Sequence, residues 1–259
     1  MRHFLTVIIV LAALFPAVEA SGEGPFDKLN SDLTALGQDY RNLYLDTSNL
    51  ARFGAALAGA GVLANTSVDR EAQEYYRDDI RSNATDDISR VLKIPGEPLI
   101  ALPLLAGVRL AFPSDSSVGR WSQRTLRGLF VGAPAAYAVQ MLAGGGRPEE
   151  GVDSSRWQGP YQNNNSLSGH TFIGAMPLIT AAMMQENPFI KYALYAASPF
   201  TGLSRINDDK HYLSQVVIGW YLAYLSARAV ERTGPSPGFS ISAMPLGSDG
   251  VFILASRHF

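Results

Sequence analysis

The sequence predicts an all-α protein, a helical bundle that ends in a short β-hairpin. A series of apolar stretches of helical length, separated by Gly, Pro and charged segments, indicates the bundle. A change to alternating residues around a turn near the C-terminus indicates the hairpin. The chain has 259 residues, enough for one sizeable core. Its net charge of -2 and the lack of basic patches with interleaved aromatics give no indication of a nucleic-acid partner.

The first 20 residues have the composition of a secretory signal. Arg2 and His3 precede an apolar run that extends to Phe15, and small side chains before Ser21 suit a cleavage site. An uncleaved membrane anchor is the alternative. The chain has no cysteine and therefore no lipoprotein acylation site and no disulfide framework. We expect an exported protein, periplasmic or associated with the cell envelope, with a helical domain at residues 21–235.

Six apolar stretches form the predicted bundle. They cover residues 51–64, 99–112, 126–143, 171–184, 189–203 and 213–227. All six are shorter than the ~20 residues that cross the core of a bilayer, which favours a soluble or peripheral bundle. The first stretch is rich in Gly and Ala and would also pack closely in lipid, so an integral membrane protein is the alternative.

A charged stretch at residues 67–90 lies between the first two apolar stretches. Its carboxylates include Asp69 with Glu71, and Asp78 with Asp79. No histidine accompanies them, so a solvated helix face explains the pattern better than a metal site does. We predict no metal and no cofactor.

The first polar motif is Ser168-Gly169-His170, directly before the apolar stretch at 171–184. A helix that begins there presents unpaired N–H groups and a partial positive charge to a ligand. Gly169 lets the backbone come close, so an anion is the expected occupant.

Two further motifs lie at the edges of apolar stretches. Ser204-Arg205 is followed, after five residues, by His211, and Arg147 follows a run of three glycines. Taken singly, these motifs are more often a core histidine, a helix end and a solvated loop. Their order along the chain favours one shared site for a phosphoryl group.

Residues 236–259 form the predicted hairpin. Two apolar, alternating runs flank a Gly-Ser-Asp-Gly turn at residues 247–250. We expect this hairpin to pack on the bundle or to pair with a partner.

The three motifs resemble the pattern of the type 2 phosphatidic acid phosphatase (PAP2) and vanadium haloperoxidase superfamily. That pattern reads Lys-x6-Arg-Pro, then Pro-Ser-Gly-His, then Ser-Arg-x5-His-x3-Asp, and the matching segments are 140–148, 167–170 and 204–215. Three positions depart from it: Gln140 replaces the lysine, Leu167 the proline and Gln215 the aspartate. The resemblance implies a helical bundle of the PAP2 and haloperoxidase type.

The resemblance also implies a role for each motif residue. His211 would attack phosphorus to give a phosphohistidine, and His170 would protonate the leaving group. The phosphate-binding residues would be Arg147, Ser168, Gly169 and Arg205, with Ser204, Gln140 and Gln215 in support.

The departures from the pattern bear on rate. Gln215 lies one turn after His211, so its amide oxygen can accept the imidazole N–H, but it cannot stabilise a charged imidazole as a carboxylate would. Gln140 lacks the charge-assisted hydrogen bond of a lysine, a loss of about 1.5–3 kcal/mol. Candidates to replace this cation are Arg127, Arg156 and Lys210.

We therefore expect a metal-independent phosphatase that hydrolyses phosphate monoesters or pyrophosphates. A lipid-linked phosphate of the cell envelope is the preferred substrate because of the apolar helices and the export signal, and peripheral membrane contact would accompany it. The alternative is a catalytically weak or inactive phosphate-binding envelope protein. A haloperoxidase that holds vanadate is less favoured, because members with that activity have the lysine that Gln140 replaces.

Overall fold

The computed structural model describes residues 23–151, 153–233, 239–246 and 250–257. Between residues 23 and 233, every regular element that it describes is a helix, which confirms the predicted helical fold. The predicted secretory signal at residues 1–20 lies outside the described residues.

The helices follow one another through most of this range. In chain order they are α2 (Pro25–Tyr44), α3 (Thr47–Asn65), α4 (Val68–Tyr75), the π-helical turn η1 (Tyr76–Ile80), α5 (Asn83–Leu92), the 3-10 turn η2 (Ile94–Gly96), α6 (Pro98–Ala111), α7 (Ser117–Ala143), the 3-10 turn η3 (Pro148–Glu150), α8 (Gly169–Met184), α9 (Pro188–Ala197), α10 (Phe200–Asn207) and α11 (Leu213–Glu231).

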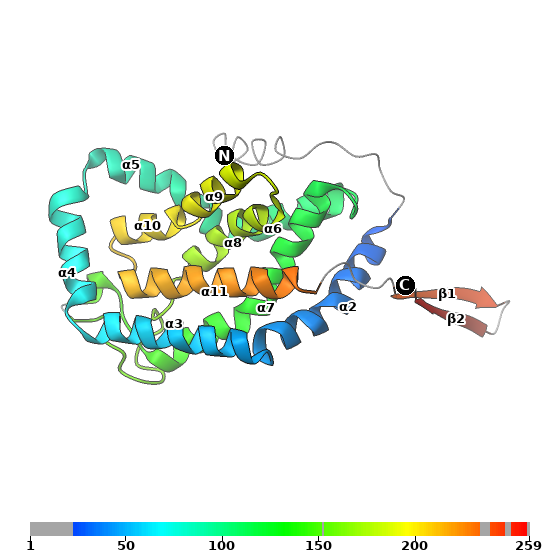
Figure 1. The fold of residues 1–259 in the computed structure, drawn as a ribbon, viewed down its shortest axis with the longest axis horizontal. Coiled ribbons are helices and arrows are strands. Elements are labelled where there is room, and N and C mark those ends of the chain that lie inside the picture. The colour runs from blue at the N-terminus through cyan, green and yellow to red at the C-terminus, as the bar shows by residue number, and fades with distance from the viewer. Residues whose placement is uncertain (1–22, 152, 234–238, 247–249, 258–259) are drawn as a thin grey trace.

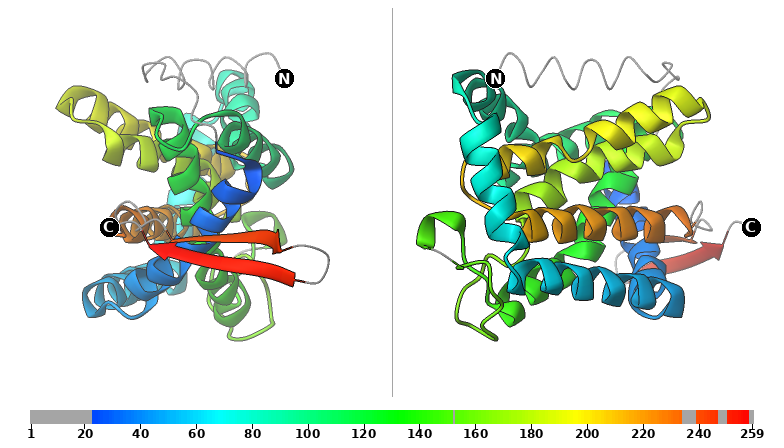
Figure 2. Two further views of the ribbon diagram at one scale, coloured as in Figure 1. Left: turned by 90° about the vertical axis from the view of Figure 1, so that its right-hand side faces the viewer. Right: turned by 60° about the vertical axis from the view of Figure 1, so that its left-hand side comes forward.

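Helix α11 lies at the centre of the bundle, where it packs against α8, α7 and α3 (Figure 1). Figure 2 shows α11 between α8 and α3. Small residues allow this close packing: a Cβ atom on Gly132 of α7 would lie 2.4 Å from the Ser226 hydroxyl of α11 and 2.7 Å from the Phe172 ring of α8. The largest fully buried apolar side chains are Leu167, Met176, Ile179, Ile218, Leu222 and Leu225. The core therefore lies where α7, α8 and α11 meet.

The structure differs from the predicted stretches in two places. The stretch at 189–203 forms two helices, α9 and α10, because Pro199 has no N–H to continue the hydrogen-bond ladder. The charged stretch at 67–90 is helical, but the prediction of a solvated face is wrong for Asp69, which is 0% exposed. Asp78 and Asp79 are exposed, as predicted.

Ion pairs attach α2 to the rest of the bundle. Arg127 of α7 binds both carboxylate oxygens of Asp39 at 2.7 Å, and Arg109 of α6 binds Asp32 at 3.0 and 3.1 Å. Buried charges of this kind are tolerated because each has its partner. Arg127 is therefore paired in the core, and the prediction that it could replace the lysine missing at position 140 is wrong.

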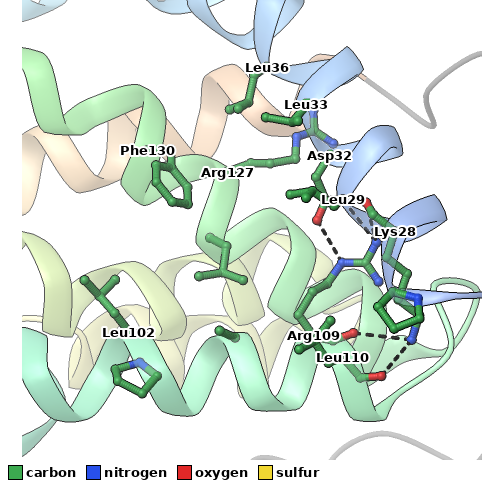
Figure 3. A pocket seen from close by; sticks show the side chains of 14 residues that line it. Lys28, Leu29, Asp32, Leu33, Leu36, Leu102, Arg109, Leu110, Arg127 and Phe130 are labelled. Atoms are coloured by element: carbon green, nitrogen blue, oxygen red, sulfur yellow. Dashed lines mark hydrogen bonds and ion pairs between the residues drawn. The ribbon is translucent and has the colours of Figure 1, made fainter.

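An apolar pocket of about 530 Å³ opens between α2, α6 and α7 (Figure 3). Its lining includes Leu29, Leu33, Leu102, Leu110 and Phe130. The cations beside it are already paired, since Lys28 donates to backbone carbonyl groups and Arg109 binds a carboxylate. Of the residues named from the sequence for the phosphate site, Arg127 lines this pocket, and it is paired with Asp39.

The described residues contain one helical segment, Ser117–Glu150, that is long and apolar enough to cross a membrane. The bent pair Asn83–Gly96 and Pro98–Ala111, whose parts meet at 52°, would be a second. Length and composition alone mark these segments, and buried core helices of soluble proteins share both properties. The choice between a peripheral and an integral position stays a prediction.

C-terminal to the helices, β1 (Phe239–Leu246) and β2 (Gly250–Arg257) run antiparallel, with Phe239 opposite Arg257. The two strands project beyond the end of the bundle in Figure 1. The connecting residues 247–249 lie outside the described residues. The turn that would join these strands into a hairpin, and the packing of the strands on the bundle or on a partner, stay predictions.

Candidate functional site

The three motif segments meet where α7 ends and where α8 and α11 begin. The Asn165 N–H donates to the Gly145 carbonyl at 3.0 Å, and the Ser168 N–H donates to the Gln215 carbonyl at 2.9 Å. A side chain adds a third link, because Nε2 of Gln215 donates to the Gly146 carbonyl at 2.6 Å. Segments that are distant in the sequence thus form one unit.

The glycine run makes the first of these segments possible. Gly144 ends α7 with a φ of 74°, in the left-handed region that favours glycine, and a Cβ there would lie 2.0 Å from the Gly159 carbonyl oxygen. The next N–H, that of Gly145, donates to the Ser166 hydroxyl at 2.5 Å. The chain can therefore turn sharply after α7 and bring Arg147 back towards the start of α8.

His211 is 5% exposed, and its Nδ1 lies 2.8 Å from Oε1 of Gln215. The neighbours of Gln215 fix the orientation of its amide, since Nε2 donates to the Gly146 carbonyl and Oε1 accepts the N–H of Tyr212. Oε1 is therefore the atom that faces the imidazole. It follows that Nδ1 carries the hydrogen and that Nε2 keeps its lone pair, the tautomer that a nucleophilic histidine needs.

The surroundings of His211 also keep it uncharged. Burial lowers its pKa from 6.5 to about 4, against the opposing effect of the hydrogen bond with Gln215. The positive charges of Arg205 and Arg147 and the nearby His170 lower this pKa further. The imidazole is therefore neutral at physiological pH, and the arginines and both histidines lie within electrostatic reach of one another.

Arg205 lies near the end of α10 and is 8% exposed. One of its terminal nitrogens lies 3.1 Å from Asp208, but its buried Nε–H has no acceptor among the residues that the structure describes. Burial lowers the pKa of Arg205 and Asp208 opposes this, while the guanidinium stays charged. An unpaired buried donor costs about 1–3 kcal/mol, and an anion bound here would remove that cost.

Arg147 is oriented by a residue to which the sequence analysis gave no role. Its Nε donates to the Asn165 side chain at 2.9 Å, and a terminal nitrogen lies 3.4 Å from Glu149. Lys210 also binds Glu149 and lowers the pKa of that carboxyl. The asparagine run at residues 163–165 was visible in the sequence, but only the fold shows which member reaches Arg147.

The start of α8 holds three of the predicted residues, Ser168, Gly169 and His170. The Ser168 hydroxyl caps the helix, accepting the Thr171 N–H at 3.3 Å and the Thr171 hydroxyl at 2.8 Å. Gly169 begins the helix, so its N–H is free of helical partners. Gln140 lies beside them: its Nε2 donates to the Leu167 carbonyl at 2.9 Å and would lie 3.5 Å from a Cβ on Gly169. Gln140 thus reaches the motif, but its amide is bound to the backbone.

Three other residues named from the sequence bind partners outside the motif segments. Ser204 donates its hydroxyl to the Thr201 carbonyl within α10. Arg156 lies 3.4 Å from Asp153, and Lys210 binds Glu149. Neither of these two cations is free to take the place of the lysine that Gln140 replaces.

His170 contacts a residue that the motifs did not include. Its Nε2 lies 2.9 Å from Oε1 of Glu97, which immediately precedes α6. Lys93, on the same segment, lies 3.5 Å from Asp208, the partner of Arg205. No motif precedes α6 in the sequence, so only the tertiary structure could have indicated these residues.

A polar pocket of about 200 Å³ adjoins the site. It is lined by Arg70, Gln73, Glu74, Arg77, Pro148, Glu149, Gly151 and Tyr212. Within the described ranges, no group of three His, Asp or Glu side chains is arranged to hold a metal ion.

The geometry of the site agrees with a comparison to known families. Residues 132–235 match the model of the PAP2 superfamily. This part of the chain belongs to the PAP2 superfamily. The PAP2 match begins within α7 and includes all three motifs, so the resemblance inferred from them is confirmed. PAP2 is a phosphatase-type family, while searches of the curated proteins and of the solved structures give no match.

Proposed function

We propose that this protein is a phosphatase that hydrolyses phosphate monoesters or pyrophosphates without a metal, through a phosphohistidine on His211. The observation that carries the proposal is the hydrogen-bond chain from Gly146 through Gln215 to His211. It leaves a neutral imidazole with the Nε2 lone pair available, beside two arginines that attract a phosphate.

The first step is attack of His211 Nε2 on phosphorus. As the P–N bond forms, the bond from phosphorus to the leaving oxygen breaks, and that oxygen takes a proton from His170. The free Nε–H of Arg205 and the guanidinium of Arg147 offset negative charge on the phosphoryl oxygens, together with the N–H of Gly169 at the start of α8.

The second step hydrolyses the phosphohistidine and regenerates free His211. His170, now neutral, accepts a proton from water as the water oxygen attacks phosphorus, and the P–N bond breaks to release phosphate. In the phosphohistidine that the first step forms, the His211 ring bears a positive charge. Gln215 orients that ring but offers no negative charge, so we expect slower turnover than an aspartate at this position would give.

A lipid-linked phosphate of the cell envelope is the substrate that we propose. Large apolar side chains are exposed on α2, α6 and α7, among them Phe26, Leu33, Leu99, Leu110 and Phe130. Apolar surface of this kind is typical of contact with a membrane or another apolar surface. It supports a protein that works beside lipid, and we propose that this protein is exported and peripheral to the envelope membrane.

The decisive experiment measures phosphate release in the presence of EDTA from a panel of lipid and water-soluble phosphate esters. We expect turnover by the wild-type protein and loss of it in His211→Asn, with lipid phosphates turned over faster than soluble esters. Circular dichroism and thermal melting of the variant serve as the folding control. Faster turnover of soluble esters would overturn the lipid assignment alone.

A phosphate-binding protein with little or no turnover is the second candidate, favoured by one observation. Gln140 and Gln215 are both bound to backbone carbonyl groups, and Arg127, Arg156 and Lys210 are all paired elsewhere. Phosphate binding by the wild-type protein with no phosphate release from any ester would select this function.

A further inference from the structure

A short segment outside the PAP2 match packs against the predicted proton donor. Turn η2 and the residues on either side of it, Lys93 to Glu97, join α5 to α6 and lie against α8 and α10. Gly96 is the point of closest approach: a Cβ there would lie 2.4 Å from the His170 carbonyl oxygen and 2.7 Å from the Thr201 side chain. Only glycine permits this packing, which places the next residue, Glu97, beside the His170 ring.

The Glu97 side chain is directed to His170 rather than to its own helix. Glu97 occupies the N-cap position of α6 but makes no capping hydrogen bond, and Pro98 at the first helical position has no N–H to offer. Instead, Oε1 of Glu97 lies 2.9 Å from Nε2 of His170, and both side chains are partly exposed. The partly exposed Glu97 carboxylate thus binds the His170 imidazole instead of being hydrated by water alone.

The hydrogen bond assigns the two ring nitrogens of His170. A carboxylate only accepts, so Nε2 carries a hydrogen and donates it to Glu97. The proton that leaves during the reaction is then the one on Nδ1, and the hydrogen bond becomes charge-assisted while both nitrogens are protonated.

We propose that Glu97 is the positioning residue of the proton donor: it holds the His170 ring so that Nδ1 faces the leaving oxygen. The proposal rests on the phosphatase function proposed above, and it extends the site beyond the PAP2 match to the segment Lys93–Glu97. Glu97 does not touch the phosphoryl group and acts through His170.

The expected consequence depends on the leaving group. A 4-nitrophenolate leaves without a proton, whereas an alkoxide needs one from His170. Loss of Glu97 should therefore slow the cleavage of alkyl phosphates and leave that of 4-nitrophenyl phosphate nearly unchanged. Loss of fold or of phosphate binding would slow both alike.

The experiment compares kcat/KM for 4-nitrophenyl phosphate and for an alkyl monophosphate in the wild-type protein, Glu97→Ala and Glu97→Gln, because kcat/KM reports the first step and excludes the hydrolysis of the phosphohistidine that both esters share. We expect Glu97→Ala to lower kcat/KM for the alkyl ester about 10- to 100-fold and for the nitrophenyl ester less than about 3-fold. Glu97→Gln, which keeps an acceptor but no charge, should fall between. The exposed Glu186, in the loop after α8, supplies a matched control as Glu186→Ala.

Equal losses on both esters in Glu97→Ala, or no loss on either, would overturn the positioning role while the phosphatase function stands. An inactive wild-type protein would overturn the phosphatase function instead. In that event, long-range ¹H–¹⁵N spectra of the histidine rings still test the geometry: a hydrogen on Nε2 of His170 that depends on Glu97 supports the contact, and a hydrogen on Nδ1 alone refutes it.

Discussion

At the scale of single residues, two glutamines occupy positions where the PAP2 pattern has charged side chains. Gln215 keeps the hydrogen-bonding part of the aspartate's role, because the Gly146 carbonyl turns its Oε1 towards His211. Gln140 keeps the place of the lysine but donates to the Leu167 carbonyl. The hydrogen bond that orients the His211 ring is therefore kept, but the site lacks one positive and one negative charge of the PAP2 pattern.

The substitution Gln140→Lys should raise the rate of phosphate release. A lysine restores a charge-assisted hydrogen bond of about 1.5–3 kcal/mol to the phosphoryl group, which corresponds to a gain of about 10- to 150-fold. Steady-state kinetics of both proteins on one ester check this. Gln140→Met, similar in length but without charge, is the control and should not accelerate the reaction. An unchanged rate in Gln140→Lys would show that another cation already acts there.

At the scale of elements, the site depends on how α11 begins. Tyr212, at the N-cap position, makes no capping hydrogen bond with its side chain, and the missing acceptor comes from another helix. Asp69 of α4 accepts the N–H of Ser214 at 2.8 Å and its hydroxyl at 2.5 Å. Burial raises the pKa of Asp69 and these two bonds oppose that effect. A carboxylate at a helix start is stabilising, so α4 helps to fix α11 and with it His211 and Gln215.

The substitution Asp69→Ala should lower the free energy of unfolding by about 1–3 kcal/mol, because it leaves a buried N–H and a buried hydroxyl without an acceptor. Urea denaturation followed by circular dichroism measures this loss. Asp78→Ala, at an exposed position of the neighbouring turn η1, is the control and should change stability little. Equal stabilities of the two variants would contradict the capping role.

At the scale of the whole molecule, burial of His211 makes stability depend on pH. The unfolded chain protonates this imidazole at about 6.5, and the folded protein does so at about 4. Between these values the unfolded state binds more protons, so stability decreases as the pH falls from 6.5 towards 4. Above pH 6.5 the imidazole is neutral in both states and contributes no slope.

The His211 contribution should amount to about 3 kcal/mol across this range, since each pKa unit corresponds to about 1.36 kcal/mol. Denaturation curves between pH 7 and pH 4 for the wild-type protein and His211→Asn measure it as a difference. Other groups, including Asp69, titrate in both proteins and cancel. Parallel stability profiles for the two would show that the imidazole is not held neutral by the fold.

The sequence by itself determined the helical fold and the PAP2 membership of residues 132–235, because helix periodicity and the spacing of the motifs are local properties of the chain. It also pointed to His170, His211, Arg147 and Arg205, whose residue types are required by the chemistry of a phosphoryl group. Helix breaks were less predictable, as Pro199 shows, because an apolar stretch does not reveal where the backbone ladder is interrupted.

Only the tertiary structure decided which polar residues are partners. Glu97 on His170, Asn165 on Arg147 and Asp69 on α11 are contacts between segments far apart in the sequence or without a motif. The tertiary structure also decided that Arg127 forms an ion pair with Asp39 and that Asp69 is buried. The physical reason is the same in each case: a hydrogen bond or ion pair depends on distance in space and on exclusion of water, and packing of the helices sets both.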